Sequence, residues 1–490
     1  MPPTHGAFAE FSHTYAALPE RFHVRVPPTP VAAPALIAFN DDLASEIGVD
    51  RSQLSDASLA AICAGNSVPE GALPLAMAYA GHQFGSFVPQ LGDGRALLIG
   101  EVVDLQGKRR DLQWKGAGPT PFSRRGDGRA ALGPVLREYL VSEAMHALGL
   151  PTTRALSAAT TGESVLREGG PLPGGVLIRV AASHVRIGTF EFFAARGDVD
   201  AVRALADYAI ARHYPQLRDD PDRYFALFEA VAERQSSLIA RWMEIGFIHG
   251  VMNTDNMTIS GETIDFGPCA FMDEYDPATV YSFIDRRGRY AYGNQPDILQ
   301  WNLARLAETL LPLIDADPGQ AIERATASLH GVPARFDRHW LAGFRRKLGL
   351  GVCVDEGGDR ALVTGLLAVM QAEAADFTST FRALAGAATD DTALPGAFLD
   401  WTHRWRERLS REPGGIENYI ATMRRTNPVY IPRNHRIEEI IAAAVQDGDF
   451  GPFHTLHTVL ARPFALQPDS DPYRTPPLPH ERVQNTFCGT

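Results

Sequence analysis

The hydrophobic pattern changes along the chain, and these changes limit the folds that are open to it. After two short helical segments, apolar residues recur in the short runs of β-strands with one helix among them, and from residue 199 onward they recur mainly at the spacing of helices. The predicted strands cover residues 95–104, 109–115 and 174–182. Helices are predicted at residues 41–47, 56–64, 131–148, 199–213, 222–245, 297–313 and 435–446. The sequence therefore predicts an α+β protein in which a small β-rich part precedes a larger helical part.

From residue 90 onward, a glycine loop, a hairpin, a helix and a further strand follow one another, and helices come after them. This order is the layout of the protein-kinase fold, so we expect a kinase-like two-lobed fold with extensions at both ends. The predicted units are an N-terminal extension at residues 1–85, an N-lobe at 86–182, a helical C-lobe at 183–400 and a helical C-terminal extension with a tail at 401–490.

Composition excludes several classes of protein. The 490 residues carry a formal net charge of −12 and 45% are hydrophobic, which suits a soluble globular protein with a sizeable core. The surplus of carboxylates argues against a nucleic-acid binder, since phosphate contacts need clustered lysine and arginine. The four cysteines are too far apart for a metal knuckle or a dense disulfide framework. Because no targeting signal and no membrane-spanning apolar run is evident, we expect a cytoplasmic protein without a membrane partner.

A glycine loop and a lysine introduce the candidate chemistry. Gly92 and Gly94 would let the backbone approach a polyphosphate, whose charge Arg95 would meet. Lys115 ends the second hairpin strand, and Glu138 in the following helix is placed to pair with it as in kinases. The alternatives are a tight turn at the glycines and an ordinary surface lysine.

Two further motifs stand in the order that protein kinases show. His249 and Asn256 have the spacing of the kinase catalytic loop, and Asp265 begins an Asp-Phe-Gly triplet. In kinases the asparagine and the aspartate of these motifs hold Mg²⁺. We expect a short hairpin at 257–264 to bring these two oxygen ligands together on one cation.

One kinase position is missing from the loop. The residue two after His249, where kinases keep their catalytic base, is Val251, which accepts no proton. The loop contains another carboxylate, Asp255, but it is adjacent to Asn256 and so does not have the usual geometry. Either the protein only binds a nucleotide or it uses ATP in another pose.

Several longer strings resemble the selenoprotein O family of protein adenylyltransferases, a pseudokinase group, and the resemblance runs nearly the full length of the chain. The matching stretches are residues 79–85, 92–95, 114–118, 123–129, 249–256, 265–267 and 433–435. The resemblance implies a kinase-like fold that binds ATP in an inverted orientation, with Mg²⁺ or Mn²⁺ as the cofactor. AMP would then pass to serine, threonine or tyrosine hydroxyls of protein substrates, and pyrophosphate would leave.

The resemblance also assigns roles to single residues. The implied nucleotide-binding residues are Gly92, Gly94, Arg95, Lys115, Asp127, Gly128, Arg179, Arg186 and Asp265. Asn256 and Asp265 are the implied metal ligands, and Asp255 is the implied catalytic base. A buried triphosphate needs several cations, which Arg179 and Arg186 could supply. The ordinary alternatives are a salt bridge at Arg179 and a simple turn at Asp127 and Gly128.

Two cysteines gain a role through the resemblance. In the family, a disulfide between the region after the Asp-Phe-Gly triplet and the tail is linked to redox control, which here implies Cys269 and Cys488. We expect the tail at 475–490 to be mobile. The alternative is that Cys269 is a small buried apolar residue and Cys488 a terminal thiol.

Three other activities remain open. A conventional phosphotransferase would need a carboxylate at Val251. A non-catalytic nucleotide-binding scaffold would not need to keep Lys115, Glu138, Asn256 and Asp265. The third is transfer of UMP from UTP.

Overall fold

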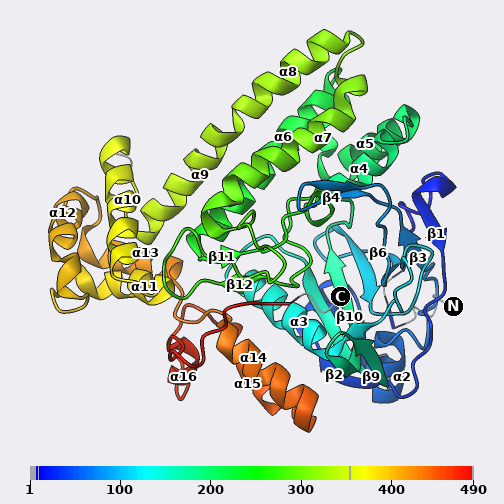
Figure 1. The fold of residues 1–490 in the computed structure, drawn as a ribbon, viewed down its shortest axis with the longest axis horizontal. Helices are drawn as coiled ribbons and strands as arrows, with labels where there is room; N and C mark the ends of the chain where they lie inside the picture. Colours follow the sequence, from blue (N-terminus) through cyan, green and yellow to red (C-terminus); the bar gives the residue numbers. More distant parts are fainter. Residues whose placement is uncertain (1–6, 9, 353–354, 488–490) are drawn as a thin grey trace.

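The computed structural model describes residues 7–8, 10–352 and 355–487, and it combines one large sheet with many helices (Figure 1). This combination confirms the predicted α+β class. The sheet has the strand order β1-β3-β6-β7-β10-β9-β2, and β8 pairs with β10 beside this path. The strands of the sheet are β1 (His23–Arg25), β2 (Ala35–Phe39), β3 (Leu75–Met77), β6 (Ala96–Val103), β7 (Arg109–Lys115), β8 (Ala130–Ala131), β9 (Arg154–Arg167) and β10 (Gly170–Ala181).

The middle of the sheet is covered by other elements, which explains its apolar sequence. Every residue of β6 except Val103 is buried. The helix α3 (Leu132–Ala147) packs against β9 and β10, as Figure 1 shows. The helix α2 (Asp56–Cys63) packs against β2, β9 and β10, and the Trp114 indole donates a hydrogen bond of 2.9 Å to the Ile62 carbonyl. Strands that are covered in this way have continuous apolar runs instead of alternating ones.

The structure confirms the predicted hairpin and the predicted helices, with small shifts at their ends. The helices concerned are α1 (Asp41–Glu46), α2, α3, α5 (Val199–His213), α6 (Arg223–Glu244), α7 (Gln295–Ile314) and α14 (Asn434–Ala442). Strand β9 was not predicted, and the short hairpin expected at 257–264 is wrong. Thr258 instead forms a β-bridge with Arg186, and Thr263 forms one with Thr152. The two sides of the expected hairpin therefore pair with segments near the sheet and not with each other.

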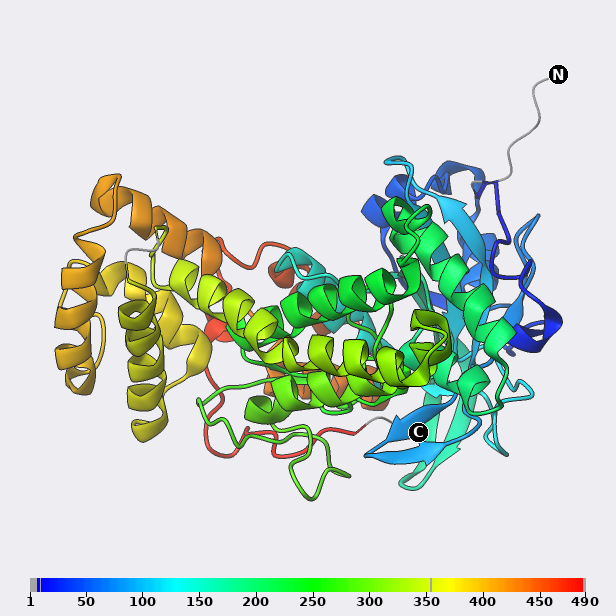
Figure 2. The ribbon, with the colours of Figure 1, turned by 90° about the horizontal axis from the view of Figure 1, so that it is seen from above.

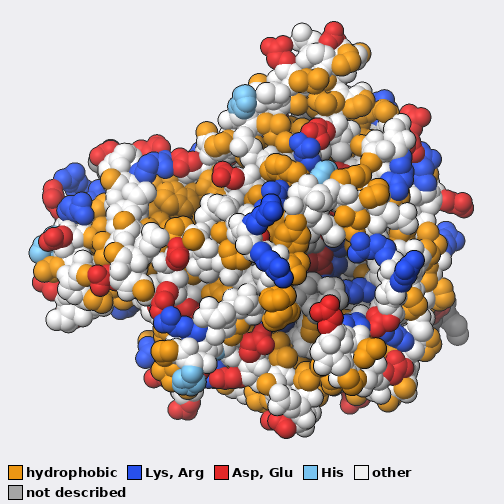
Figure 3. All heavy atoms as spheres, viewed as in Figure 1, with side chains coloured by type: hydrophobic (Ala, Val, Ile, Leu, Met, Phe, Trp, Pro, Cys, Tyr) orange, Lys and Arg blue, Asp and Glu red, His pale blue; other side chains and the backbone are white. Residues whose placement is uncertain are grey.

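Helices form the larger part of the molecule. They include α4 (Ile187–Ala194), α8 (Pro318–His330) and α9 (Val332–Lys347), and α6 packs against both α7 and α9. The helices at the end farthest from the sheet (Figure 2) contribute most of a second hydrophobic core. Its helices are α10 (Glu356–Ala372), α11 (Phe377–Ala387), α12 (Leu399–Leu409) and α13 (Gly415–Thr426). Figure 3 shows a hollow on the face of the molecule that is viewed in Figure 1. The domain boundaries given above remain predictions.

The C-terminal helices return to the sheet and enclose α3. Both α14 and α15 (Gly451–Leu460) pack against α3, and the Tyr139 and Phe453 rings lie 5.6 Å apart. Arg137 forms an ion pair with Glu438 and donates a hydrogen bond of 3.2 Å to the Cys269 carbonyl. The chain then passes through the short helix α16 (Asp471–Arg474). Among the described residues, no helix has both the length and the apolar character needed to cross a bilayer.

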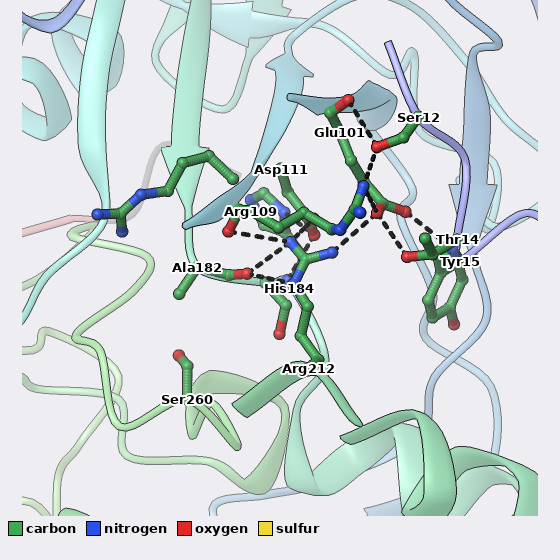
Figure 4. Close-up of polar contacts among 12 residues, drawn as sticks. Ser12, Thr14, Tyr15, Glu101, Arg109, Asp111, Ala182, His184, Arg212 and Ser260 are labelled. Carbon is green, nitrogen blue, oxygen red and sulfur yellow. Dashed lines mark hydrogen bonds and ion pairs between the residues drawn. The ribbon is translucent and has the colours of Figure 1, made fainter. Parts of the chain in front are cut away.

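A buried charged network joins α5 to the sheet (Figure 4). Arg212 donates to Glu101 Oε2 at 2.9 Å and to Asp111 Oδ1 at 2.5 Å. Its Nε also donates to the Ala182 carbonyl, just after β10, at 3.0 Å. All three charged side chains are nearly inaccessible to solvent, so each depends on the others for compensation of its charge.

The same network holds the N-terminal segment. Glu101 accepts hydrogen bonds from the Thr14 hydroxyl at 2.5 Å and from the Tyr15 backbone amide at 2.7 Å. The backbone amide of His184 donates to Asp111 at 3.0 Å, and burial lowers the pKa of the His184 imidazole to about 4. His184 is therefore neutral at neutral pH, and Arg212 is the principal counter-charge of the two carboxylates (Figure 4).

Candidate active site

A cavity of about 910 Å³ contains the predicted site residues. It lies where the glycine loop, β7, α3 and β10 face the loop at 249–256. The predicted nucleotide and metal binders, the predicted base and the predicted partner of Lys115 all line this cavity: Gly92, Gly94, Arg95, Lys115, Asp127, Gly128, Glu138, Arg179, Arg186, Asp255, Asn256 and Asp265. The structure thus brings together positions that are far apart in the sequence.

Lys115 and Glu138 form the predicted ion pair. The Lys115 ammonium lies 2.5 Å from Glu138 Oε2 and 2.6 Å from Asp265 Oδ1. Lys115 is the last residue of β7, and Glu138 lies on the part of α3 that faces the sheet. Glu143, five residues further along α3, pairs instead with Arg154 at 2.8 Å.

Asp265 is the centre of a cluster of three cations. Besides Lys115, Arg179 donates to its Oδ1 at 2.5 Å and Arg186 donates to its Oδ2 at 2.7 Å. Burial opposes the ionisation of Asp265, but Lys115 and the two arginines hold the pKa of its carboxyl well below the usual range. Asp265 also has a φ of 62°, a conformation that non-glycine residues rarely adopt and that is common at functional sites.

The charge of the cavity favours an anionic ligand. Eight basic and six acidic side chains line it. Burial raises the pKa of Asp93 to about 6 and that of Asp255 to about 7, so the negative charge at neutral pH is smaller than this count suggests. Arg95 lines the cavity and forms no ion pair with any residue that the structure describes. Figure 3 shows basic side chains gathered around the hollow.

Asn256 and Asp265 offer oxygen atoms to a cation. The Asn256 amide nitrogen donates to the Val251 carbonyl at 2.9 Å, which leaves its carbonyl oxygen available on the cavity side. Within the described ranges, no group of three or more histidine, cysteine, aspartate and glutamate side chains could hold a metal. The residues present therefore fit Mg²⁺ or Mn²⁺ only as a partial set that ligand oxygens complete, which is how Mg²⁺ is usually held beside phosphates.

Asp255 is a buried carboxylate with one unsatisfied atom. Its Oδ2 accepts a hydrogen bond from Gln83 at 3.3 Å, whereas the buried Oδ1 has no partner within the described structure. Burial raises the pKa of Asp255 to about 7 although Arg186 and Gln83 oppose the shift. A carboxyl group with such a pKa can exchange a proton near neutral pH.

The hairpin that carries Gln83 was not recognised as part of the site. It consists of β4 (Gly81–Gln83) and β5 (Ser86–Val88), and a side chain at Gly81 would collide with Asp255. His82 anchors it, because its ring lies 2.5 Å from Glu191 and its backbone amide donates to Thr254 at 2.7 Å. The only sequence signal was that residues 79–85 form one of the matching strings.

The glycines of the site are needed for packing. A Cβ atom at Gly92 would lie 2.3 Å from the Phe122 ring, and one at Gly94 would lie 2.9 Å from the Phe122 carbonyl. Gly128 has a φ of 66° and approaches the Gly118 backbone so closely that no side chain fits. Close packing within the protein is thus a sufficient reason for these glycines, besides the predicted approach to phosphate.

Asp127 lies at the rim of the cavity and is largely exposed. It pairs with Arg167 at 2.8 Å and accepts a hydrogen bond from the Arg129 backbone amide at 2.9 Å. These contacts are those of a turn, and they leave the residue in position to face a ligand.

The predicted redox pair is described only in part. Cys269 is buried, and its sulfur lies 3.4 Å from the Phe266 carbonyl. Cys488 lies outside the described residues. The expected mobility of the tail is wrong at Thr486, which is buried and donates from its backbone amide to the Tyr281 carbonyl at 2.7 Å. The tail therefore reaches the segment that follows the Asp-Phe-Gly triplet.

Comparisons with known proteins identify a family that matches most of the chain. The model of the family described as protein adenylyltransferase SelO matches residues 7–461. A protein nucleotidyltransferase YdiU from Rhizobium etli (strain CIAT 652) is 62% identical over 493 residues, which cover 99% of this chain and 98% of the relative. A protein of the same description from Agrobacterium fabrum is 61% identical, and the match covers 98% of this chain and 100% of the relative. Another from Bradyrhizobium sp. is 60% identical, and the match covers 98% of this chain and 99% of the relative.

Proposed function

The chain belongs to the SelO family of protein adenylyltransferases and is a nucleotidyltransferase, and from this we propose that it transfers AMP from ATP to serine, threonine or tyrosine hydroxyls of protein substrates. Pyrophosphate would be the leaving group. The observation that carries the proposal is the cluster of Lys115, Arg179 and Arg186 around Asp265 at one cavity. Three cations at one point suit the β- and γ-phosphates of a nucleotide whose α-phosphate faces the entrance.

The chemistry needs a base and a means of stabilising charge. We assign the base to Asp255, since Val251 accepts no proton and Asp255 has a pKa near 7. The oxygen of the substrate hydroxyl bonds to the α-phosphorus, its proton passes to Asp255, and the bond from the α-phosphorus to pyrophosphate breaks. Asn256 and Asp265 would hold Mg²⁺ or Mn²⁺, which when bound neutralises phosphate charge.

The remaining residues would position the nucleotide. Glu138 orients the Lys115 ammonium, and Arg95 meets phosphate charge from the glycine loop. Asp127 and Gly128 would contact the nucleotide at the rim of the cavity. Because the relatives are described as nucleotidyltransferases without a named nucleotide, transfer of UMP from UTP is the second candidate.

Labelled nucleotides test the transferred group. Incubation with a protein mixture should transfer label from α-labelled ATP and none from γ-labelled ATP, because the cation cluster favours an inverted nucleotide. Parallel reactions with α-labelled UTP measure whether the enzyme prefers ATP or UTP. Label arriving only from the γ-position would identify a conventional phosphotransferase, and nucleotide binding without any transfer would identify a scaffold.

Substitutions in the ion pair separate direct from indirect contact with phosphate. Lys115→Met should lower the rate of transfer about a hundredfold, because the ammonium touches phosphate. Glu138→Gln should lower it only about tenfold, since this carboxylate orients the lysine. Initial rates at saturating and limiting ATP measure both effects. Full activity of Lys115→Met would show that the lysine does not contact the nucleotide.

A further inference from the structure

Exposed apolar side chains cluster beside the cavity entrance. Phe283, Ile284 and Phe487 are 49%, 59% and 62% exposed, and the rings of Phe283 and Phe487 lie 5.0 Å apart. Phe283 and Ile284 come from the segment that follows strand β12 (Ala270–Phe271), and Phe487 comes from the tail. Grouped exposed apolar side chains are typical of sites that bind another protein.

The backbone beneath these side chains is well fixed. Thr486 and the segment at 281–283 exchange two backbone hydrogen bonds, of 2.7 and 3.3 Å, in a β-bridge of Thr486 with Ser282. On the other side, Asp285 is buried and accepts hydrogen bonds from the Arg289 and Tyr290 amides at 2.9 and 2.7 Å. The apolar group is therefore presented on a defined frame, which lowers the entropic cost of binding a partner.

This frame is connected to the proposed catalytic loop. Ile284 lines the same cavity as Asp255. The Tyr290 hydroxyl donates to Asn253 at 2.6 Å, and Asn253 lies two residues before Asp255. A polypeptide bound across Phe283 and Ile284 would thus lie at the entrance through which a hydroxyl must reach the α-phosphate.

The surroundings of the apolar group are basic. Arg286 and Arg287 are exposed and form no ion pair within the part of the chain that the structure describes. Arg124 and Arg125 line the cavity, are exposed and likewise have no acidic partner among the described residues. This local surplus of positive charge is notable in a chain whose net charge is −12. It is complementary to an acidic partner.

We propose that Phe283, Ile284, Phe487, Arg286 and Arg287 form a docking surface for the protein substrate. The segment that it binds carries several acidic residues and one large apolar residue close to the modified hydroxyl. The apolar residue packs on the exposed rings, and the acidic residues pair with the arginines. The inference rests on the proposed function for the identity of the reaction, but the docking itself can be measured without any transfer.

Charge reversal tests the basic part of the docking surface. The probes are two fluorescent peptides of equal length, each with one serine, one threonine, one tyrosine and one phenylalanine, flanked by glutamates in the first and by lysines in the second. Fluorescence anisotropy should show that the wild type prefers the glutamate peptide. The double variant Arg286→Glu/Arg287→Glu should bind it about tenfold more weakly and prefer the lysine peptide. The matched control is Arg424→Glu/Arg425→Glu, which alters two adjacent exposed arginines of α13 and should keep wild-type binding.

A second pair of variants tests the apolar part. Ile284→Asp should weaken binding of the glutamate peptide about tenfold, because it removes apolar contact and adds a repelling charge. Ile322→Asp is the control, since Ile322 is 53% exposed on α8, away from the cavity. The ATP affinity of both variants, measured by calorimetry, shows whether the substitution weakens peptide binding alone or nucleotide binding as well.

The outcomes distinguish the two proposals. Equal binding of the two peptides by the wild type, or equal behaviour of the Arg286/Arg287 and Arg424/Arg425 variants, would overturn the docking surface even if AMP transfer occurs. Transfer of label from α-labelled ATP to the glutamate peptide, lost in parallel with binding, supports both proposals. Selective binding without transfer of any label would retain the docking surface and contradict the proposed reaction.

Discussion

Replacing Asp265 with asparagine should lower the rate of nucleotide transfer by about a thousandfold or more. The substitution keeps the shape of the side chain but removes the negative charge that Lys115, Arg179 and Arg186 share. It also removes the only charged ligand in the proposed metal pair, because Asn256 is neutral. We expect metal-dependent ATP affinity, measured by calorimetry, to fall together with the rate.

Asp255→Asn is the matched comparison for this experiment. A base acts on the transition state, whereas a metal ligand acts on the bound nucleotide as well. The Asp255 variant should therefore keep its ATP affinity and lose about a hundredfold or more in rate. Equal losses of ATP affinity in the two variants would make Asp255 a ligand and leave the base unassigned. Circular dichroism of both variants confirms that they are folded.

Replacing Arg212 with methionine should lower the free energy of unfolding by about 3–5 kcal/mol. The change leaves Glu101 and Asp111 buried without their principal counter-charge and removes the contact of α5 with the Ala182 carbonyl. Methionine retains an unbranched apolar side chain, so the loss reports mainly on charge. Urea denaturation at neutral pH, followed by circular dichroism, measures it.

An exposed ion pair provides the control for Arg212. Arg338 is 60% exposed and pairs with Glu233, so Arg338→Met should change the free energy of unfolding by only about 0.5 kcal/mol. Adding Glu101→Gln and Asp111→Asn to Arg212→Met should recover part of the lost stability, because no buried charge then remains uncompensated. Similar small losses for Arg212→Met and Arg338→Met would show that the network contributes little.

The sequence predicted elements whose own residues specify them. β7 and α5 begin and end at the predicted residues. In β7 apolar and polar side chains alternate, in α5 apolar side chains recur at helical spacing, and turn or capping residues bound both elements. β9 could not be recognised in this way, since its sequence is rich in alanine, serine and threonine. Its hydrogen bonds come from β10 on one side and β2 on the other, so the strand is specified by neighbours elsewhere in the chain.

The same distinction applies to the site. Lys115, Glu138, Asn256 and Asp265 could be proposed because they occupy a known order of motifs. Gln83 could not, since its contact with Asp255 joins residues that are 172 positions apart and depends on how one hairpin folds over a loop. Sequence spacing carries no information on such a contact when the fold is not yet known.

The enclosure of α3 has a consequence for regulation. This helix carries Glu138 and is held by the sheet on one side and by α14 and α15 on the other, with Arg137 tied to both Glu438 and the Cys269 backbone. Swinging Glu138 away from Lys115 would require the tightly packed Tyr139 and Phe453 rings to separate. We therefore expect that moving this helix would be costly, and that the Lys115 and Glu138 pair stays assembled with and without nucleotide. Control of such an enzyme falls instead on access to its entrance.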